Sequence, residues 1–295
     1  MALMDPFLDA LFREIKANAE QVKNCGLRVV AIYAGGGTPT TLSARQLDRL
    51  CKKLEDEFDL SALREFSVEA GRPDTITLEK LEALRRHGVS RVSVNPQTME
   101  DAVLEAIGRR HTAQDIRDAL ALVRRVGGFQ VNMDLIAGLP ADTVGGFRRT
   151  IDEVIKLAPE NITVHTLSRK RGSSLLENEA PLPTAEDVAC MLDYAQEQLT
   201  DFGFEPYYLY RQKFMSGGFE NVGWTKPGAE NLYNICIMEE LCGIIAMGGG
   251  ASTKLTASGG RIRRMFCPKY PKEYIEKIDQ LCENKQEIAA WYTES

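Results

Sequence analysis

Polar residues follow several short apolar runs of the sequence, at the points where buried strands of a parallel sheet would end. In parallel α/β folds the binding site forms at the carboxyl ends of the strands, so these residues carry the most weight. The successive groups are Gly35 to Thr40, Glu69, Asn95 with Gln97, Asp134 and Thr166. Five consecutive strands that end in hydrogen-bonding groups predict one polar ligand lying across the sheet.

The first of these groups reads Gly35-Gly36-Gly37-Thr38-Pro39-Thr40. Three glycines allow a ligand to approach the backbone closely, and their amides can donate to a carboxylate or a similar group. A tight strand-to-helix turn needs the same residues, so the glycines alone leave both roles open. The segment matches neither G-x-x-x-x-G-K-[ST] nor G-x-G-x-x-G, which disfavours phosphate cradling and dinucleotide binding.

Two carboxylates, Glu69 and Asp134, are suited to accept hydrogen bonds from an amine or from ribose hydroxyls. An ion pair or a cap at the end of the sheet would use the same residue types, so this alternative stays open for both. For His87 and His111 we expect surface or helix-end roles.

The elements that must position these residues alternate between short apolar runs and longer segments of helical period, which is typical of βα units around a parallel sheet. The predicted strands are 27–34, 66–70, 91–95, 131–137 and 161–167. Capping-box spacings at Thr112 with Asp115 and at Thr184 with Asp187 predict two helix starts. The pattern predicts an α/β fold, a partial parallel (β/α) barrel, with its core in residues 1–170.

Residues 171–295 are predicted to hold the remainder of the barrel and an α+β elaboration on the substrate side. An aromatic strand at 205–210 is followed by a glycine-rich segment, 214–260, that we expect to be irregular, and helical period returns at 270–281.

Composition narrows the class of protein. The chain of 295 residues has a formal net charge of -6, which argues against a general nucleic-acid binder. No apolar run approaches the roughly 20 residues that span a bilayer, and the first residues do not have the pattern of a secretory signal, so we expect a cytoplasmic protein. The seven cysteines are scattered and suggest neither disulfides nor a zinc site; Cys236 and Cys242 are expected to be buried small hydrophobes.

Several motifs occur in an order that resembles the oxygen-independent coproporphyrinogen III oxidase family of radical S-adenosylmethionine enzymes. They are Ala34-Gly35-Gly36-Gly37-Thr38-Pro39-Thr40, residues 66–74 with the sequence FSVEAGRPD, residues 91–98 with RVSVNPQT, residues 107–111 with IGRRH and residues 133–140 with MDLIAGLP. The similarity covers most of residues 5–275. Asn95, together with residues 164–167 and 206–213, is more similar to the coproporphyrinogen dehydrogenase branch.

The resemblance implies S-adenosylmethionine as a cofactor. By position, the residues around it would be Gly36, Gly37, Thr38, Glu69, Gln97, Arg109 and Asp134, with Ser168 and Ser252 as further candidates. The implied reaction converts propionates of coproporphyrinogen III to vinyl groups with loss of carbon dioxide, in haem biosynthesis. It begins when a reduced [4Fe-4S] cluster cleaves the cofactor to a deoxyadenosyl radical.

The implied substrate is a tetrapyrrole that carries several carboxylates, and guanidinium groups match planar carboxylates well. The basic candidates follow the fifth strand and the aromatic strand, and they are Arg169, Lys170, Arg171, Arg211 and Lys213. A solvated positive loop is the alternative. His165 could serve a proton or the tetrapyrrole, or it could be structural.

In the family, three cysteines in a C-x-x-x-C-x-x-C loop hold the cluster, and the chain contains no such triplet. We expect this segment, with the first barrel strand, to lie upstream of Met1, and the strand from Leu27 then has an unpaired edge. Residues 1–295 alone are therefore expected to be inactive, without a site-differentiated cluster. The alternatives are a haem- or porphyrin-binding, chaperone-like relative without radical chemistry, and a remnant that only binds S-adenosylmethionine.

Overall fold

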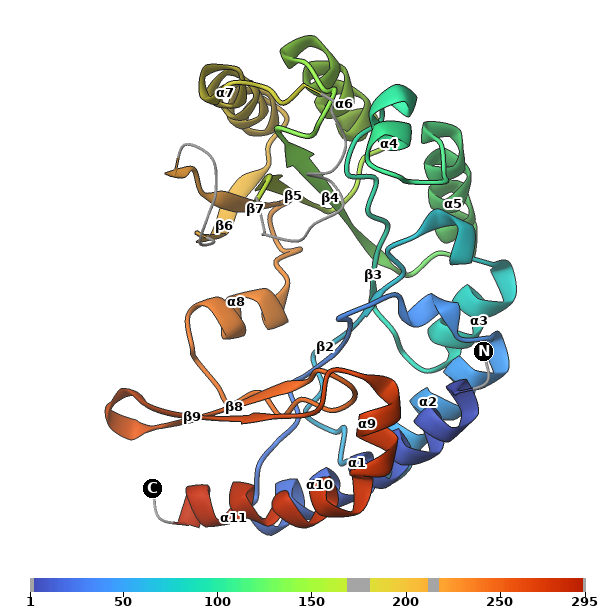
Figure 1. Cartoon of the computed structure of the whole chain (residues 1–295), viewed down its shortest axis with the longest axis vertical. Coiled ribbons are helices and arrows are strands. Elements are labelled where there is room, and N and C mark those ends of the chain that lie inside the picture. The colour runs from blue at the N-terminus through green and yellow to red at the C-terminus, as the bar shows by residue number, and fades with distance from the viewer. Residues whose placement is uncertain (1–2, 169–180, 212–217, 294–295) are drawn as a thin grey trace. The chain divides into compact units, whose positions relative to one another are not determined.

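The structure is a computed structural model that describes residues 3–168, 181–211 and 218–293 (Figure 1). The chain divides into two compact units that are interleaved in sequence. One unit contains Met1–Ile32, Ala44–Glu65 and Tyr233–Ser295, and the other contains Tyr33–Ser43 and Phe66–Leu232. The expected domain division near residue 170 stays a prediction.

The larger unit is built on a mixed sheet of seven strands. In spatial order they are β1 (Ala31–Ala34), β2 (Glu65–Glu69), β3 (Arg91–Ser93), β4 (Gln130–Ala137), β5 (Asn161–Thr166), β7 (Asn221–Thr225) and β6 (Glu205–Tyr210). The pairs from β2 to β5 are parallel, whereas β7 pairs antiparallel with both β5 and β6. The sheet is a half-barrel, as predicted, and its parallel order ends at β5.

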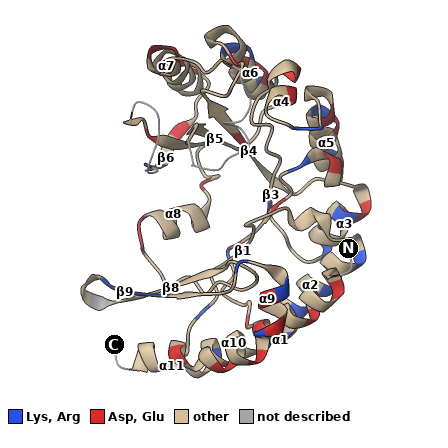
Figure 2. Cartoon of the chain, in the orientation of Figure 1, with Lys and Arg blue, Asp and Glu red and all other residues tan. Residues whose placement is uncertain are grey.

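Helices follow the strands and cover one face of this sheet (Figure 1). Within this unit they are α3 (Leu78–Arg86), α4 (Asp101–Ala106), α5 (Ala113–Val126), α6 (Val144–Lys156) and α7 (Ala185–Asp201), whereas α2 (Ala44–Glu57) belongs to the smaller unit. Both predicted capping boxes are present, because Thr112 caps α5 with Asp115 and Thr184 caps α7 with Asp187. Charged residues of both signs occur together on these helices (Figure 2).

The sheet has one apolar face and one polar face. In β4 the side chains of Val131, Met133 and Leu135 are fully buried, while Asn132 and Asp134 are half-buried. Successive side chains of a strand point to opposite faces, so the buried set lies against the helices and the polar set lies on the inner face. The inner face of the half-barrel is therefore the face that can hold a polar ligand.

The smaller unit combines helices with a hairpin. Its elements include α1 (Met4–Asn24), α8 (Leu232–Met238), β8 (Ser252–Ala257), β9 (Arg261–Phe266), α9 (Pro271–Glu276), α10 (Ile278–Asn284) and α11 (Gln286–Thr293). Strands β8 and β9 pair antiparallel, and Ala10 of α1 packs against Tyr274 and Ile278. The predicted α+β character of the carboxyl-terminal part is confirmed.

The expectation that residues 214–260 are irregular is wrong, because this segment contains β7, α8 and β8. These elements are short and lie among glycine-rich loops, and β7 pairs with β5, more than 50 residues earlier, so local periodicity does not reveal them. Among the described helices, none is both long and apolar enough to cross a membrane.

Candidate functional site at the strand ends

Glu69, the last residue of β2, lies at the centre of the predicted site. The phenol of Tyr33 in β1 donates to Oε1 of Glu69 over 2.5 Å, and the backbone N–H of Gly36 also donates to this carboxylate. Burial raises the pKa of Glu69, and the charge of Asp134 acts in the same direction, while the two hydrogen bonds oppose the rise. Glu69 is thus a carboxylate that depends on its donors to remain ionised.

The three glycines have different surroundings. A Cβ atom on Gly35 would lie 2.8 Å from the carboxyl carbon of Glu69 and would also strike the ring of Tyr33. Apart from the neighbouring residues in the chain, no atom of the described residues lies within 4 Å of a Cβ built on Gly36 or Gly37, and Gly36 has a φ of +78°. Gly35 is therefore required by close packing inside the chain, whereas Gly36 and Gly37 border open space in which a ligand could lie.

Asp134 stands on the neighbouring part of the inner face, in β4. Its Oδ1 accepts from Nδ2 of Asn132 at 2.8 Å and lies 3.8 Å from Nε2 of His165. Burial alone would raise the pKa of Asp134, but the nearby imidazole of His165 and hydrogen bonds from Asn132 and Thr163 hold it below its usual value. Glu69 and Asp134 are thus two carboxylates with opposite pKa shifts.

Gln97 lies beside Asp134 because the chain after β3 rejoins the sheet. The backbone N–H of Gln97 donates to the carbonyl of Asp134 at 3.0 Å, and the carbonyl of Gln97 accepts from Ile136 at 2.9 Å. Gln97 has a φ of +68°, which is rare for a residue with a side chain. The backbone bonds fix this conformation next to the strand that carries Asp134.

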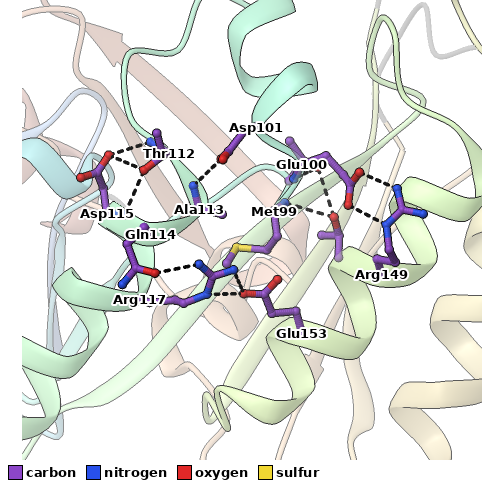
Figure 3. A network of polar contacts seen from close by, with 12 residues as sticks. Met99, Glu100, Asp101, Thr112, Ala113, Gln114, Asp115, Arg117, Arg149 and Glu153 are labelled. Carbon is purple, nitrogen blue, oxygen red and sulfur yellow. Dashed lines mark hydrogen bonds and ion pairs between the residues drawn. The ribbon is translucent and has the colours of Figure 1, made fainter.

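A network of polar contacts holds the segment that follows Gln97 (Figure 3). Arg149 of α6 makes two hydrogen bonds to Glu100, of 3.0 and 2.5 Å, and Arg117 of α5 pairs with Glu153 at 2.6 Å. The backbone N–H of Met99 donates to the hydroxyl of Thr150 at 3.1 Å. The contacts of Glu100 and Met99 tie the segment between β3 and α5 to α6, and the pair of Arg117 with Glu153 joins α5 to α6.

The predicted roles of two histidines have different outcomes. His87 forms the C-cap of α3, so its helix-end role is confirmed. A surface role for His111 is wrong, since this side chain is only 6% exposed and forms a hydrogen bond with the backbone of Pro96. The pKa of His111 is lowered by burial and by the charge of Arg109. Arg109 itself is exposed after α4.

The remaining candidates are less well brought together. Thr38 precedes a short 3-10 helix, where its carbonyl accepts from Thr41 at 2.9 Å. Ser168 is half-buried just beyond β5, and Ser252 begins β8 in the other unit, so the structure does not place Ser252 relative to Glu69.

Among the basic candidates for the substrate, Arg211 is exposed and pairs with Glu220 at 3.0 Å. Three basic candidates for the substrate, Arg169, Arg171 and Lys213, lie outside the described residues, as does Lys170.

Sequence reasoning missed two tyrosines of the site. Tyr33 binds Glu69, and the hydroxyl of Tyr210 in β6 lies 3.0 Å from Nδ1 of His165. Tyr33 precedes Gly35 by two residues in a strand, and residues two apart share a face. This spacing could have indicated Tyr33. The contact of Tyr210 with His165, in contrast, depends on where β6 pairs in the sheet.

The donors and acceptors of the inner face fit S-adenosylmethionine, which carries an amine, a carboxylate and ribose hydroxyls. The carboxylates of Glu69 and Asp134 are of the acceptor type that an amine and hydroxyls need, and Gly36 and Gly37 leave space near Glu69. An iron–sulfur cluster does not fit the described residues in the same way. Among them, no three His, Cys, Asp or Glu side chains gather closely enough to hold a metal.

Comparisons with known proteins show the family of the chain. The family model described as the Radical SAM superfamily matches residues 8–154. The oxygen-independent coproporphyrinogen-III oxidase-like protein HemZ of Bacillus subtilis is 43% identical over 283 residues, which are 95% of this chain and 56% of that protein. The heme chaperone HemW of Lactococcus lactis is 29% identical, over 84% of this chain and 62% of that protein.

A solved structure described as coproporphyrinogen III oxidase (HemN) from Escherichia coli, a radical SAM enzyme, matches with a TM-score of 0.72 and 24% identity. That match covers 94% of this chain and 63% of the solved chain, and it supports the fold. The HemW protein of Bacillus subtilis is 31% identical over 74% of this chain and 58% of its own length. The chain thus spans about three fifths of the length of these relatives.

The half-barrel and the matched family model define a protein of the radical S-adenosylmethionine superfamily. Within that superfamily, the chain belongs to the oxygen-independent coproporphyrinogen oxidase-like family.

Proposed function

We propose that the inner face of the half-barrel binds S-adenosylmethionine and serves the oxygen-independent oxidative decarboxylation of coproporphyrinogen III. In this reaction, two propionates become vinyl groups and protoporphyrinogen IX forms, as in the coproporphyrinogen dehydrogenase branch. The observation that carries the proposal is the pair of carboxylates, Glu69 and Asp134, on one face of the sheet, with Gly36 and Gly37 near Glu69. Its support from relatives is the 43% identity to the oxidase-like protein HemZ.

Each residue of the proposed cofactor site has a physical role. Glu69 accepts from the amine of the cofactor, Asp134 accepts from the ribose hydroxyls, and the backbone amides at Gly36 and Gly37 donate to the carboxylate. The imidazole of His165, together with the hydrogen bonds from Asn132 and Thr163, favours the ionised form of Asp134 against the effect of burial. The remaining residues of the proposed site are Thr38, Gln97, Arg109, Ser168 and Ser252.

The cofactor, when bound and cleaved with one electron from a reductant, would supply hydrogen-atom abstraction. Since the described residues do not form a cluster site, we assign no reaction step to an iron–sulfur cluster here. The proposed substrate is a tetrapyrrole with several carboxylates, and Arg169, Arg171, Arg211 and Lys213 are the proposed partners of those carboxylates. Of these four, Arg211 is described, and it is exposed next to the end of β6.

Calorimetric titration of residues 1–295 with S-adenosylmethionine tests the cofactor site. We expect saturable binding that Glu69→Gln and Asp134→Asn each weaken by roughly tenfold or more, since each removes a hydrogen bond to a charged group. Asp193→Asn on the exposed side of α7 is the matched control and should bind like the parent chain. Absence of binding to the folded parent chain would remove the proposal.

The second candidate function is that of a haem- or porphyrin-binding chaperone-like relative without radical chemistry. Two relatives named heme chaperone HemW, which match 84% and 74% of this chain, favour it. Absorbance titrations with haem and with coproporphyrin III, a stable analogue of the proposed substrate, separate the two functions. Preference for the tetracarboxylate supports the oxidase, whereas tight haem binding without an effect of S-adenosylmethionine supports the chaperone-like function.

A further inference from the structure

The proposed cofactor site contains a tyrosine, Tyr33, whose hydroxyl donates a hydrogen bond to Glu69. The distance from Oη of Tyr33 to Oε1 of Glu69 is 2.5 Å, and the two residues come from the neighbouring strands β1 and β2. Hydrogen bonds from a neutral donor to a carboxylate are shorter and stronger than those between neutral groups. The phenol therefore restricts the rotamer of Glu69 as well as its charge.

Close packing at Gly35 fixes the same pair. A Cβ atom on Gly35 would collide with the ring of Tyr33 and would lie 2.8 Å from both the carboxyl carbon and Oε1 of Glu69. The ring and the carboxylate thus both rest against the backbone of Gly35. Because Gly36 and Gly37 have open space beside them, this contact lies at the edge of the space available to a ligand.

Opposing effects act on the protonation of the Glu69 carboxyl group. Burial and the negative charge of Asp134, from β4, favour the neutral acid. Tyr33 from β1 and the N–H of Gly36 favour the carboxylate. An ionised carboxylate has about four acceptor positions, so two donors leave positions for a ligand.

We propose that Tyr33 is a positioning residue of the cofactor site, which holds the carboxylate of Glu69 ionised and oriented toward an ammonium group of the bound cofactor. The inference rests on the proposed S-adenosylmethionine site and extends it to a residue that touches Glu69 and not the cofactor. Its consequence is that Tyr33 sets the lower pH limit of cofactor binding, since a protonated Glu69 cannot pair with an ammonium group.

The variant Tyr33→Phe removes the hydroxyl and keeps the ring that packs on Gly35. Carbon-13 NMR of the Glu69 carboxyl in the ligand-free chain, assigned with Glu69→Gln, gives its titration directly. We expect the carboxyl to titrate at a pH higher by about one unit in Tyr33→Phe, because the strongest donor is lost. Tyr194→Phe is the matched control, since it removes a hydroxyl that bonds Asp152 on an outer helix at 2.7 Å.

Calorimetry over a pH range supplies the second measurement. Tyr33→Phe should weaken S-adenosylmethionine binding by roughly tenfold on the acidic side, where Glu69 becomes protonated, and by less than about threefold at alkaline pH. In a Glu69→Gln background the same change should have less than about a twofold effect at every pH, because the two residues act as one unit.

An unchanged Glu69 titration in the folded variant, or an equal loss of affinity at every pH, would overturn the role of Tyr33. Failure of the parent chain to bind S-adenosylmethionine would overturn the proposed cofactor site. The NMR titration needs no ligand, so it still decides whether Tyr33 controls the charge of Glu69 in that case.

Discussion

Nε2 of His165 lies 3.8 Å from Oδ1 of Asp134, across the parallel pair of strands β4 and β5. The register of this pair places His165 opposite Ile136 and Thr163 opposite Asp134, so the imidazole reaches the carboxylate diagonally on the inner face. Nδ1 of the same ring meets the hydroxyl of Tyr210 at 3.0 Å. A single imidazole thus connects the proposed cofactor carboxylate to the antiparallel edge of the sheet.

Replacing His165 by leucine should reverse the pH dependence that Asp134 gives to stability. The pKa of Asp134 now lies below its usual 3.8, so its carboxylate stabilises the fold above that pH and loses this effect as the pH falls further. Replacement of His165 removes contributions that lower this pKa, so we expect it to rise. We expect a loss of about 1–3 kcal/mol at pH 7 by urea unfolding, and a smaller loss near pH 4.

The double variant Asp134→Asn with His165→Leu is the control for that experiment. It should recover part of the stability lost at pH 7, because no buried charge is left without its partner. Equal losses for the single and double variants at both pH values would contradict the coupling of the two residues.

Gly35→Ala should disturb the site far more than Gly37→Ala. The new methyl group at position 35 would meet Glu69 at 2.8 Å, whereas position 37 has no atom within 4 Å. Overpacking of this kind costs about 1–3 kcal/mol, and the shift of Glu69 should weaken S-adenosylmethionine binding at least about tenfold. Thermal unfolding and calorimetry of the two variants provide the comparison, and similar behaviour of both would refute the packing argument.

Asp142→Asn should stabilise the protein at neutral pH. Asp142 is 6% exposed, its Oδ2 has no hydrogen-bond partner among the described residues, and burial raises its pKa from 3.8 to about 6. A raised carboxyl pKa contributes stability that is present below pH 3.8 and is lost as the pH rises through about 6. The variant should therefore gain about 1–3 kcal/mol at pH 7.5 and little at pH 4 in urea unfolding. A gain of equal size at both pH values would exclude protonation as its cause.

The smaller unit contains a buried ion pair whose disruption should be costly. Nζ of Lys285 lies 2.6 Å from Oε1 of Glu14, with side chains 4% and 0% exposed, and the N–H of Gly248 also donates to Glu14. Lys285→Met leaves a buried carboxylate without its cation, which costs about 3–5 kcal/mol. The exposed pair of Lys277 with Glu273 is the control, and Lys277→Met should cost less than about 1 kcal/mol. Chemical denaturation measures both, and comparable losses would be inconsistent with the burial of Glu14.

The periodicity of the sequence predicted much of the fold because its determinants are local. The βα alternation up to β5 and the caps at Thr112 and Thr184 depend on residues a few positions apart, and the structure confirms them. Strand β7 was missed because its stability comes from β5 and β6. For His111 the expected roles were at the surface or at a helix end, and nothing in its neighbouring residues reveals that it is buried beside Pro96.

The sequence by itself determined which residues end the parallel strands, and thus the presence of Glu69, Gln97 and Asp134 near one edge of the sheet. Only the tertiary structure decided which partner each carboxylate has. Tyr33 binds Glu69 and His165 approaches Asp134 because strand pairing and register bring distant residues together on one face. These partners set the charge of the two carboxylates, since a pKa depends on burial and neighbouring charges in space and not on the order of residues in the chain.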